Sequence, residues 1–420
     1  MSLVQAFRSL TRVQVRVFAG CFLGWTLDSF DFFILTWCLD SVAANFHISI
    51  ETATDALVWT LVMRPVGALL FGALAERFGR RRVLMINILC FSLCEFGSAF
   101  APTFALFLAS RALFGIAMGG EWGVGAALAF ETLPKKGRGF FSGVLQEGYV
   151  TGNLLSAALY GLVFPHLHGH GYMVNWRVLF MLGALPSVIV LAILKGVPES
   201  PAWLARKQAA QSTDFVAAPK VLRQIAMHFP SFVMMVLMMT AFMSFSHGTQ
   251  DLYPTFLKHD GGLAKTTASW VGVVANLGAL TGGICCGTLS EYFGRRKVIV
   301  IAALLAIPMI PLWAWSHTAV MLAVGGFLMQ FMVQGAWGVV PVHLNELSPA
   351  PVRAVFPGLA YQLGNLISSY NNHIQAGLAV SVFGGRYAPV LAWTVVVMGI
   401  ALALLAGFGK EAKDADLSSA

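Results

Sequence analysis

The sequence predicts an all-α membrane protein with twelve transmembrane helices, arranged as two pseudo-symmetric six-helix bundles. Three observations predict it: an apolar composition, twelve long apolar runs, and a second half that repeats the first. Of the 420 residues, 57% are hydrophobic and only 11% are charged. An average soluble domain has roughly a quarter charged residues, which cover its water-facing surface. This composition therefore excludes an ordinary soluble enzyme.

The apolar runs have the length that a bilayer requires, since a transmembrane helix needs ~20 mostly apolar residues. The first run, from about residue 17 to residue 39, is too long for the core of a signal peptide, so we expect it to remain in the mature protein. Polar breaks separate the runs that follow. The spans are centred near residues 28, 65, 92, 115, 150, 186, 242, 277, 306, 330, 367 and 398.

The longest polar stretch separates the spans into two sets of six. We predict an N-terminal bundle at 1–196, a cytoplasmic linker at 197–227, and a C-terminal bundle with a short cytoplasmic tail at 228–420. Prolines at 198 and 201 end the sixth helix.

The basic residues predict the orientation in the membrane. The net charge of +8 comes from short clusters between the apolar runs, so we expect lipid headgroups rather than nucleic acid as their neighbours. Of the 27 Lys and Arg residues, 21 fall on one side of the predicted spans and 4 on the other. Cytoplasmic loops carry such an excess, so both termini should be cytoplasmic in a cell (inner) membrane protein.

A repeat relates the two halves. The segment GALAERFGRRRVL from Gly72 recurs as GTLSEYFGRRKVI from Gly287, a shift of 215 residues. A single shift that aligns several separated features indicates duplication, and transporters often place a midplane site between such repeats. The same shift relates Trp122 to Trp337, Glu131 to Glu346, Pro134 to Pro349, Arg138 to Arg353, and Gly143 to Gly358.

Ionisable residues inside the spans are candidates for function. Each costs at least ~2.5–3.5 kcal/mol on insertion scales and so needs a partner, water or a role. These residues are Asp28, Asp31, Arg64, Glu95, Arg111, Glu121, Glu147, His247 and Asp251.

The seventh span carries the most informative pair. His247 and Asp251 are four residues apart, so on a helix they share one face and can share a proton. A histidine coupled to a carboxylate in a partly dry cavity suits a proton carrier. The alternative is a polar cap at the outer end of the span, because Pro254 and Lys258 follow closely.

The loop motif G-x-x-x-D/E-R-x-G-R-R and its copy, together with Arg111-x-x-x-Gly115-x-x-x-Gly119 and the PESP segment after the sixth span, resemble the major facilitator superfamily. Both copies of the loop have Glu where that superfamily usually has Asp. The resemblance implies that the loops act as a conformational latch; otherwise they are positive-inside charge on a Gly turn. The latch residues would be Gly72, Glu76, Arg77, Gly79, Arg80, Glu291, Gly294 and Arg295.

The sequence of span 7 narrows the resemblance to one family within that superfamily. The pattern Ser-His-x-Thr-Gln-Asp-x-x-x-Thr from Ser246 resembles the signature of lactate permeases in the sialate:proton symporter family, although Met243 replaces their usual Asn. Gln362 and Asn365 in span 11 resemble that family's substrate-contacting pair, and Arg64 its span 2 arginine. The Asp-Ser-Phe-Asp run from Asp28 and the Gly-Gly-Glu-Trp-Gly run from Gly119 also resemble family features.

The resemblance implies a proton-coupled symporter of short monocarboxylates such as lactate or pyruvate, working by alternating access. A guanidinium matches a carboxylate with two parallel hydrogen bonds, so Arg64 is the expected anion ligand; the alternative is a salt bridge with Asp28, Asp31 or Glu121. The expected substrate-binding set is Arg64, Gln362, Asn365 and His247. The expected proton-coupling set is His247, Asp251, Asp28, Asp31 and Glu121.

For most of the remaining candidate residues, a structural role is a simpler interpretation than a functional one. We interpret Arg111 as mainly structural and Glu95 as peripheral. Glu147 maps onto Gln362 under the shift of 215, so both are candidates for the central cavity, although Glu147 could instead pair with a neighbour. A weak metal tract of histidines is more simply solvent-exposed, and the cysteines fit small core residues. The histidines are His166, His168 and His170; the cysteines are Cys21, Cys38, Cys90, Cys94, Cys285 and Cys286.

Other functions remain as alternatives. The same scaffold could carry sialate, an aromatic acid or a dicarboxylate, and a membrane sensor could bind carboxylates without moving them. A drug antiporter is disfavoured because span 5 lacks the Gly-Pro pair of that motif, and no enzyme motif lies on a water-facing segment. We expect no enzymatic activity, no cofactor beyond the coupling proton, no metal site, and a monomer. The partners are a small organic acid anion, the proton and the lipid bilayer.

Overall fold

The computed structural model describes residues 10–167, 175–209, 218–413 and 415–417. Within those ranges the secondary structure is helical, without a strand. The first half contains α2 (Arg12–Phe46), α3 (Ile50–Phe78), α4 (Arg80–Ser98), α5 (Phe104–Thr132), α6 (Arg138–Gln146), α7 (Gly148–Val163), α8 (Asn175–Ala184) and α9 (Ser187–Lys195). The second half contains α12 (Phe229–Gln250), α13 (Tyr253–His259), α14 (Lys265–Phe293), α15 (Arg295–Ala306), α16 (Ile310–Ala314), α17 (Ala319–Leu347), α18 (Phe356–Ser368), α19 (Asn371–Ser381) and α20 (Tyr387–Phe408).

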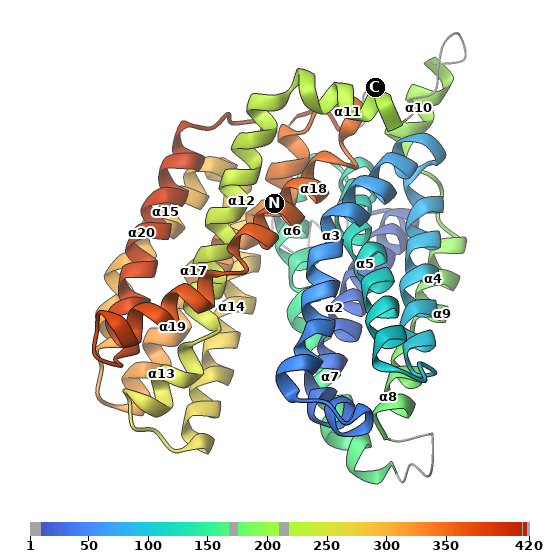
Figure 1. Ribbon diagram of the computed structural model, residues 1–420. Helices are drawn as coiled ribbons and strands as arrows, with labels where there is room; N and C mark the ends of the chain where they lie inside the picture. Colours follow the sequence, from blue (N-terminus) through green and yellow to red (C-terminus); the bar gives the residue numbers. More distant parts are fainter. Residues whose placement is uncertain (1–9, 168–174, 210–217, 414, 418–420) are drawn as a thin grey trace.

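The helices form two bundles that lie side by side (Figure 1). α2 to α9 make one bundle and α12 to α20 the other, and each bundle has its own apolar core. Two short helices join them, α10 (Pro201–Ala209) and α11 (Ala218–Met227), at the top of Figure 1. We call this end of the molecule the linker end and the opposite end the far end.

Twelve spans cross the length of the bundles, as predicted. Nine helices or joined helix pairs of the described chain are long and apolar enough to cross a membrane. The other three spans are α4, α6 with α7, and α18 with α19. α4 is long enough but less apolar, because it opens with three arginines. The other two spans are each divided into shorter helices, at Glu147 between α6 and α7 and at Ser369 and Tyr370 between α18 and α19.

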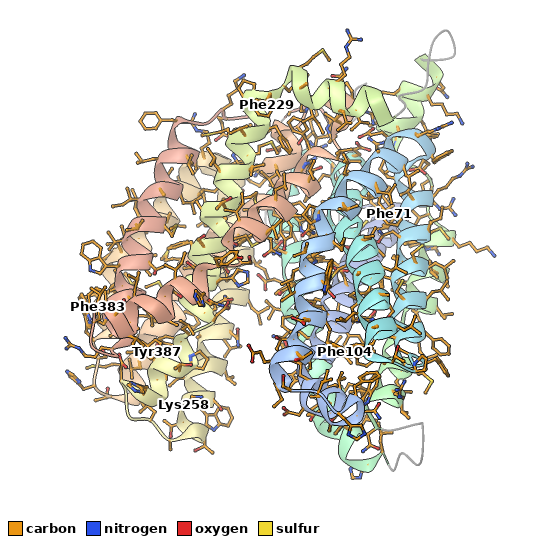
Figure 2. All side chains as sticks on the ribbon, in the orientation of Figure 1. Phe71, Phe104, Phe229, Lys258, Phe383 and Tyr387 are labelled. Carbon is orange, nitrogen blue, oxygen red and sulfur yellow. The ribbon has the colours of Figure 1, made fainter. Side chains whose placement is uncertain are left out.

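The outer surface suits a bilayer, because large apolar side chains are exposed there. Phe229 is 58% exposed and Trp393 is 60% exposed, whereas Phe71 lies in the first core at 6%. Figure 2 shows these side chains along the whole height of both bundles, with Lys258 and Tyr387 toward the far end. In water such surfaces would promote aggregation, whereas lipid tails solvate them.

Glycine turns join spans 2 and 3, and spans 8 and 9. Gly79 has φ 102° and Gly294 has φ 96°, which side chains rarely adopt. A Cβ at Gly79 would also overlap the Glu199 carboxylate. The two glycines of the repeated loop motif are therefore required by the backbone.

Small residues position α3 against α5. A Cβ at Gly115 would overlap the Thr60 carbonyl, and one at Gly119 would overlap the carbonyl of Arg64. The two helix backbones can therefore approach closely, as small residues spaced four apart allow in membranes. This contact holds the Arg64 backbone at the centre of the molecule.

Candidate functional site

A cavity of about 260 Å³ lies between the two bundles. Its lining comes from α2, α3, α6 and α7 of one bundle and from α12, α14, α17, α18 and α19 of the other. Closer to the linker end the bundles are in contact: Ser142 of α6 accepts a hydrogen bond from the Val342 N–H of α17. The molecule is therefore closed at the linker end, with its cavity on the far-end side.

Arg64 lines the cavity from α3 and is 4% exposed. Its Nη2 lies 3.7 Å from Asp28 Oδ2 and 2.8 Å from the Met118 sulfur, and its guanidinium lies 5.5 Å from the Phe32 ring centroid. Its Nε has no hydrogen-bond partner among the described residues. The Arg64 side chain thus lines the cavity and also lies beside the Asp28 carboxylate, which is the ion pair named as the alternative to anion binding.

His247 and Asp251 line the cavity from the opposite bundle. His247 Nδ1 lies 3.1 Å from Asp251 Oδ2, and the side chains are 36% and 32% exposed. Asn372 donates its Nδ2–H to the same carboxylate at 2.6 Å. The helical spacing predicted the first contact, but the second comes from α19 and was not predicted.

The rest of the lining is rich in amides and aromatic rings. Trp337 and Tyr361 line the cavity and meet edge-on with centroids 5.9 Å apart, and Trp122 stacks on Tyr361 with centroids 4.6 Å apart. Asn365 apart, sequence analysis did not predict these amide side chains, although amides inside apolar spans were a visible signal. The lining amides are Gln146, Asn153, Gln250, Asn276, Gln334, Asn365 and Asn372.

The two span 11 candidates lie in different environments. Asn365 lines the cavity. Gln362 is 1% exposed, is absent from the cavity lining, and both of its amide atoms lack hydrogen-bond partners within the described chain. The expectation that both residues border the cavity therefore does not match this conformation, because Gln362 lies one turn nearer the closed end.

The predicted coupling acids lie inside the first bundle, away from the cavity lining. Asp28 and Asp31 are at most 1% exposed, and so is Glu121. Neither Glu121 oxygen has a hydrogen-bond partner in the described structure, and a Cβ at Gly24 would lie 2.7 Å from Glu121 Oε1. A buried carboxylate without a partner is costly. Asp28 has the Arg64 guanidinium 3.7 Å away, whereas no partner of Glu121 lies in the described structure.

Arg111 and Glu95 form a separate buried pair. Arg111 Nη2 lies 2.6 Å from Glu95 Oε2, and its Nη2 also donates to Ser98 Oγ at 2.7 Å. The Phe114 ring centroid is 4.4 Å from the guanidinium. These contacts lie within one bundle and outside the cavity lining, which agrees with a structural interpretation of both residues.

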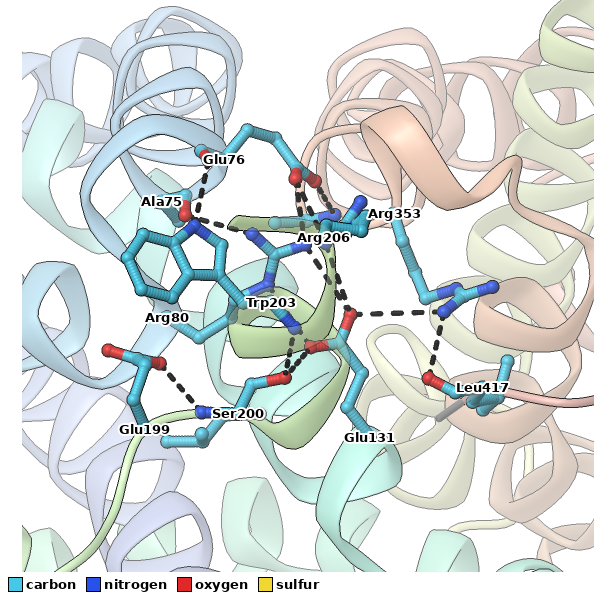
Figure 3. A network of polar contacts seen from close by, with 12 residues as sticks. Ala75, Glu76, Arg80, Glu131, Glu199, Ser200, Trp203, Arg206, Arg353 and Leu417 are labelled. Atoms are coloured by element: carbon cyan, nitrogen blue, oxygen red, sulfur yellow. Dashed lines mark hydrogen bonds and ion pairs between the residues drawn. The ribbon is translucent and has the colours of Figure 1, made fainter. Parts of the chain in front are cut away.

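The first loop motif joins the bundles at the linker end (Figure 3). Arg80 is fully buried, with Nη2 2.7 Å from Glu76 and Nε 3.1 Å from Glu131. Arg206 of α10 also contacts Glu76, at 3.3 Å. The free oxygen of Glu76 then accepts the Ala354 N–H of the other bundle at 2.8 Å. The motif thus connects both bundles and the linker.

The second motif makes the mirrored connection. Arg295 contacts Glu291 at 2.9 Å and Glu346 at 3.0 Å. Glu291 accepts the Gly139 N–H of the first bundle at 2.5 Å. Because Gly139 and Ala354 are 215 residues apart, each bundle presents one glutamate to the same position on the other.

Burial lowers the pKa of two arginines at the linker end, but both remain protonated. Burial and the neighbouring Arg80 charge lower the pKa of Arg206 from its ordinary value, while Glu76 and Glu131 oppose that shift. Burial likewise lowers the pKa of Arg353, whose Nη1 lies 3.9 Å from Glu131. Both remain cations at physiological pH because arginine starts so far above it.

The remaining predicted latch residues differ in position. A Cβ at Gly72 would lie 2.9 Å from the Val355 Cα of the other bundle, so this glycine sits at the contact between bundles. Arg77, in contrast, is exposed, lies over the Phe78 ring, and makes no ion pair with any described residue. Its position after Glu76 on the helix turns it away from the buried network.

The described residues contain no group of three or more His, Cys, Asp and Glu side chains that could hold a metal ion. His166 is exposed, and His168 and His170 lie outside the described residues.

Comparisons with known proteins agree with this geometry. The family model described as "Sugar (and other) transporter" matches residues 17–226 and 227–371. A carboxylic acid transporter protein homolog of Saccharomyces cerevisiae (strain ATCC 204508 / S288c) is 28% identical over 399 residues, covering 90% of this chain. The match spans 63% of that relative's length. The sialic acid transporter NanX of Escherichia coli (strain K12) is 27% identical, with 99% of this chain and 98% of NanX covered.

A solved structure has the same architecture. The proton:xylose symporter XylE, of the major facilitator superfamily, has a TM-score of 0.78 at 20% identity and covers 97% of this chain and 98% of its own. At that identity the likeness supports the fold alone. With the family model matching most of the chain, the protein is a multi-pass membrane transporter that belongs to the sugar (and other) transporter family.

Proposed function

We propose that the protein is a proton-coupled symporter of short monocarboxylates, such as lactate or pyruvate, that works by alternating access. One observation carries the proposal: the Arg64 guanidinium of one bundle and the His247–Asp251 pair of the other line a single cavity. A carboxylate binds a guanidinium through two charge-assisted hydrogen bonds. Asn365 lies in the same lining and supplies a donor or acceptor for a 2-hydroxyl group.

Coupling of anion transport to proton transport then follows from the free-energy cost of enclosing an unpaired charge in the cavity. Arg64 receives the anion, the His247–Asp251 pair receives the proton, and the occupied cavity carries less unbalanced charge. A buried unpaired charge disfavours closure of a dry cavity. The bundles therefore rock past one another when the cavity is either empty or holds both cargoes. Asp28 behind Arg64 balances the guanidinium when no anion is bound.

We place the linker end, and with it both termini, on the cytoplasmic side. The support is the excess of Lys and Arg in the loops at that end. The conformation described above is then the outward-facing one, ready to load cargo from outside the cell.

A second substrate class has its own supporting observation. Seven amide side chains line the cavity, more than a two- or three-carbon acid needs. Amides pair with hydroxyl groups because each offers both a donor and an acceptor. A polyhydroxylated acid such as sialate therefore fits as the alternative cargo, and the likeness to NanX over nearly the full length supports it.

The deciding experiment is uptake into proteoliposomes. Labelled L-lactate is offered with and without an imposed pH gradient, acid outside, and sialate, an aromatic acid and a dicarboxylate are offered as competitors. Accumulation of lactate above equilibrium in the presence of the gradient supports the proposal. Saturable binding with no flux would instead identify a sensor, and gradient-driven uptake of sialate alone would reassign the substrate.

A further inference from the structure

A buried acid at the closed end of the cavity has no part in the mechanism above. Glu147 stands at the break between α6 and α7 and is 7% exposed. Its neighbours in the chain, Gln146 and Tyr149, line the cavity. On its other side α6 runs to the linker end, where the bundles are in contact. Glu147 therefore lies between the cavity and the seal that closes it.

The carboxyl of Glu147 faces the backbone of the opposite bundle. A Cβ at Gly283 of α14 would overlap Glu147 Oε1, and the next nearest atoms are Glu147 Cδ at 3.4 Å and the Gln334 carbonyl oxygen at 3.5 Å. The absence of a side chain at Gly283 thus makes room for this carboxyl. One turn away, a Cβ at Gly143 of α6 would overlap the Gly283 carbonyl, so α6 and α14 touch along their backbones. We call Gly143, Glu147 and Gly283 the floor junction.

No cation in the described part of the chain forms an ion pair with Glu147 in this conformation. Its carboxyl makes no hydrogen bond or ion pair with any described residue. The helices packed against the junction are α2, α14 and α17, and the structure bonds none of their buried acids and bases to Glu147. These are Asp28 and Asp31 on α2 and His343 and Glu346 on α17; the described part of α14 buries neither an acid nor a base.

The internal repeat shows that a carboxyl is not required for packing here. Under the shift of 215 residues, Glu147 corresponds to Gln362 and Gly283 to Ala68. Both counterparts are buried, at 1% and 2% exposure. The second copy therefore places a neutral side chain of the same length in the corresponding position, so this position of the repeat does not require an ionisable group.

We propose that Glu147 is a proton-binding site that links opening of the linker end to loss of a proton. While α6 packs on α14, a dry and unpaired carboxyl is held in its neutral form, because a buried carboxylate without a partner is costly. When the bundles part at the floor junction, water reaches the carboxyl and it ionises. By linkage, protons on that side favour the closed state, so acid at the linker end holds the carrier shut.

This inference rests on the alternating-access part of the proposed function and is independent of the cargo. Its consequence is self-limiting import. A symporter that delivers protons to the linker side acidifies that side, and the closed floor junction then slows further opening.

The test measures the floor junction directly, without any cargo. Spin labels are attached at positions 82 and 297, exposed sites at the linker-end starts of α4 and α15, in protein whose six native cysteines are replaced. Distances between the labels are measured in nanodiscs from about pH 6 to about pH 9. Release of one proton on opening raises the open-to-closed ratio by up to about tenfold per pH unit.

Glu147→Gln removes the titration of this carboxyl while keeping the size of the side chain. We expect its distance distribution to shift toward the closed state, and the slope of its open-to-closed ratio with pH to fall to the part that the His247–Asp251 pair contributes. Glu147→Ala removes the carboxyl altogether and should lower that slope to the same extent, which preserves the test if the first variant folds poorly. Glu51→Gln, the same change at an exposed carboxyl on α3, should keep the unmodified protein's slope.

The proposal would be overturned if the open-to-closed ratio of either Glu147 variant changed with pH as steeply as that of the unmodified protein. It would also be overturned if the label distances in the unmodified protein did not change with pH. Because the measurement needs no substrate, it separates this inference from the proposed function. A protein that opens with pH as expected but carries no monocarboxylate would refute the proposed cargo alone.

Discussion

The Oε1 atom of Glu76 accepts the backbone N–H of Ala354 at 2.8 Å, and this bond joins the two bundles. The acceptor belongs to α3 and the donor to the segment just before α18. Glu76 is held in place by Arg80 and by Arg206 of the linker. One carboxylate thus ties three parts of the chain together in this conformation, in which the linker end is closed.

Replacing Glu76 should shift the carrier toward the open linker end. Glu76→Ala removes the bond to Ala354 and leaves Arg80 with one carboxylate fewer. A charge-assisted hydrogen bond contributes about 1.5–3 kcal/mol, so the open-to-closed ratio should rise roughly 10- to 150-fold. Spin-label distances between the linker ends of α4 and α15 measure this ratio.

Glu291→Ala should act in the same direction, because Glu291 makes the mirrored bond to Gly139. Arg138→Ala leaves both glutamate bonds intact and should have a smaller effect than either glutamate change. If both glutamate variants keep the closed distances, the two bonds do not act as a latch.

Substitution of Arg64 should abolish uptake of the anion. Arg64→Ala removes the only guanidinium in the described cavity lining, and Arg64→Lys keeps the charge but loses the paired hydrogen bonds. We expect no measurable lactate uptake for the first variant and about a 10- to 100-fold lower affinity for the second. Arg386→Ala, an exposed change at the far end, is the matched control. Normal uptake by Arg64→Ala would remove Arg64 from the binding site.

Changes in the His247–Asp251 pair should uncouple transport from the proton gradient. Asp251→Asn cannot hold the charge that pairs with His247, so uphill accumulation should be lost. Exchange of labelled for unlabelled lactate needs no net proton movement and should persist. Proteoliposome accumulation and counterflow, measured on the same preparation, separate the two. Accumulation equal to that of the unmodified protein would show that another group carries the proton.

Asn372 should affect proton binding by the His247–Asp251 pair without carrying the proton itself. Its amide donates to Asp251 at 2.6 Å, and loss of one hydrogen bond to a charged group costs about 1.5–3 kcal/mol. Asn372→Ala should therefore shift the pH at which uptake is half-maximal, with a smaller loss of maximal rate than Asp251→Asn. An unchanged pH profile would mean that this contact does not affect the titration of the pair.

Breaking the buried Arg111–Glu95 pair should reduce stability rather than alter substrate recognition. Removing one partner leaves an uncompensated buried charge, which costs about 3–5 kcal/mol. Glu95→Ala should therefore lower the melting temperature, and the double variant Glu95→Gln with Arg111→Met should recover part of it. Thermal unfolding in detergent measures both. A change in substrate affinity at unaltered melting temperature would contradict the structural interpretation.

Much of the fold could be predicted from local patterns in the sequence. Apolar runs of bilayer length predicted twelve spans, and the 215-residue shift predicted two related bundles. The His247–Asp251 contact was predictable because four residues on a helix always return to the same face. The glycines of the loop motif likewise reflect a local demand, since Gly79 and Gly294 adopt positive φ.

The sequence by itself thus determined the number of spans, their repeat, and those pairs whose spacing lies within one helix. Only the tertiary structure decided which side chains meet across the two bundles: Asn372 at Asp251, Glu76 at Ala354, Glu147 against Gly283, and Gln362 outside the cavity lining. The reason is geometric. Helical periodicity fixes relations between near neighbours in the chain, whereas contacts between bundles depend on how two rigid bodies are tilted against each other, and a carrier changes that tilt as it works.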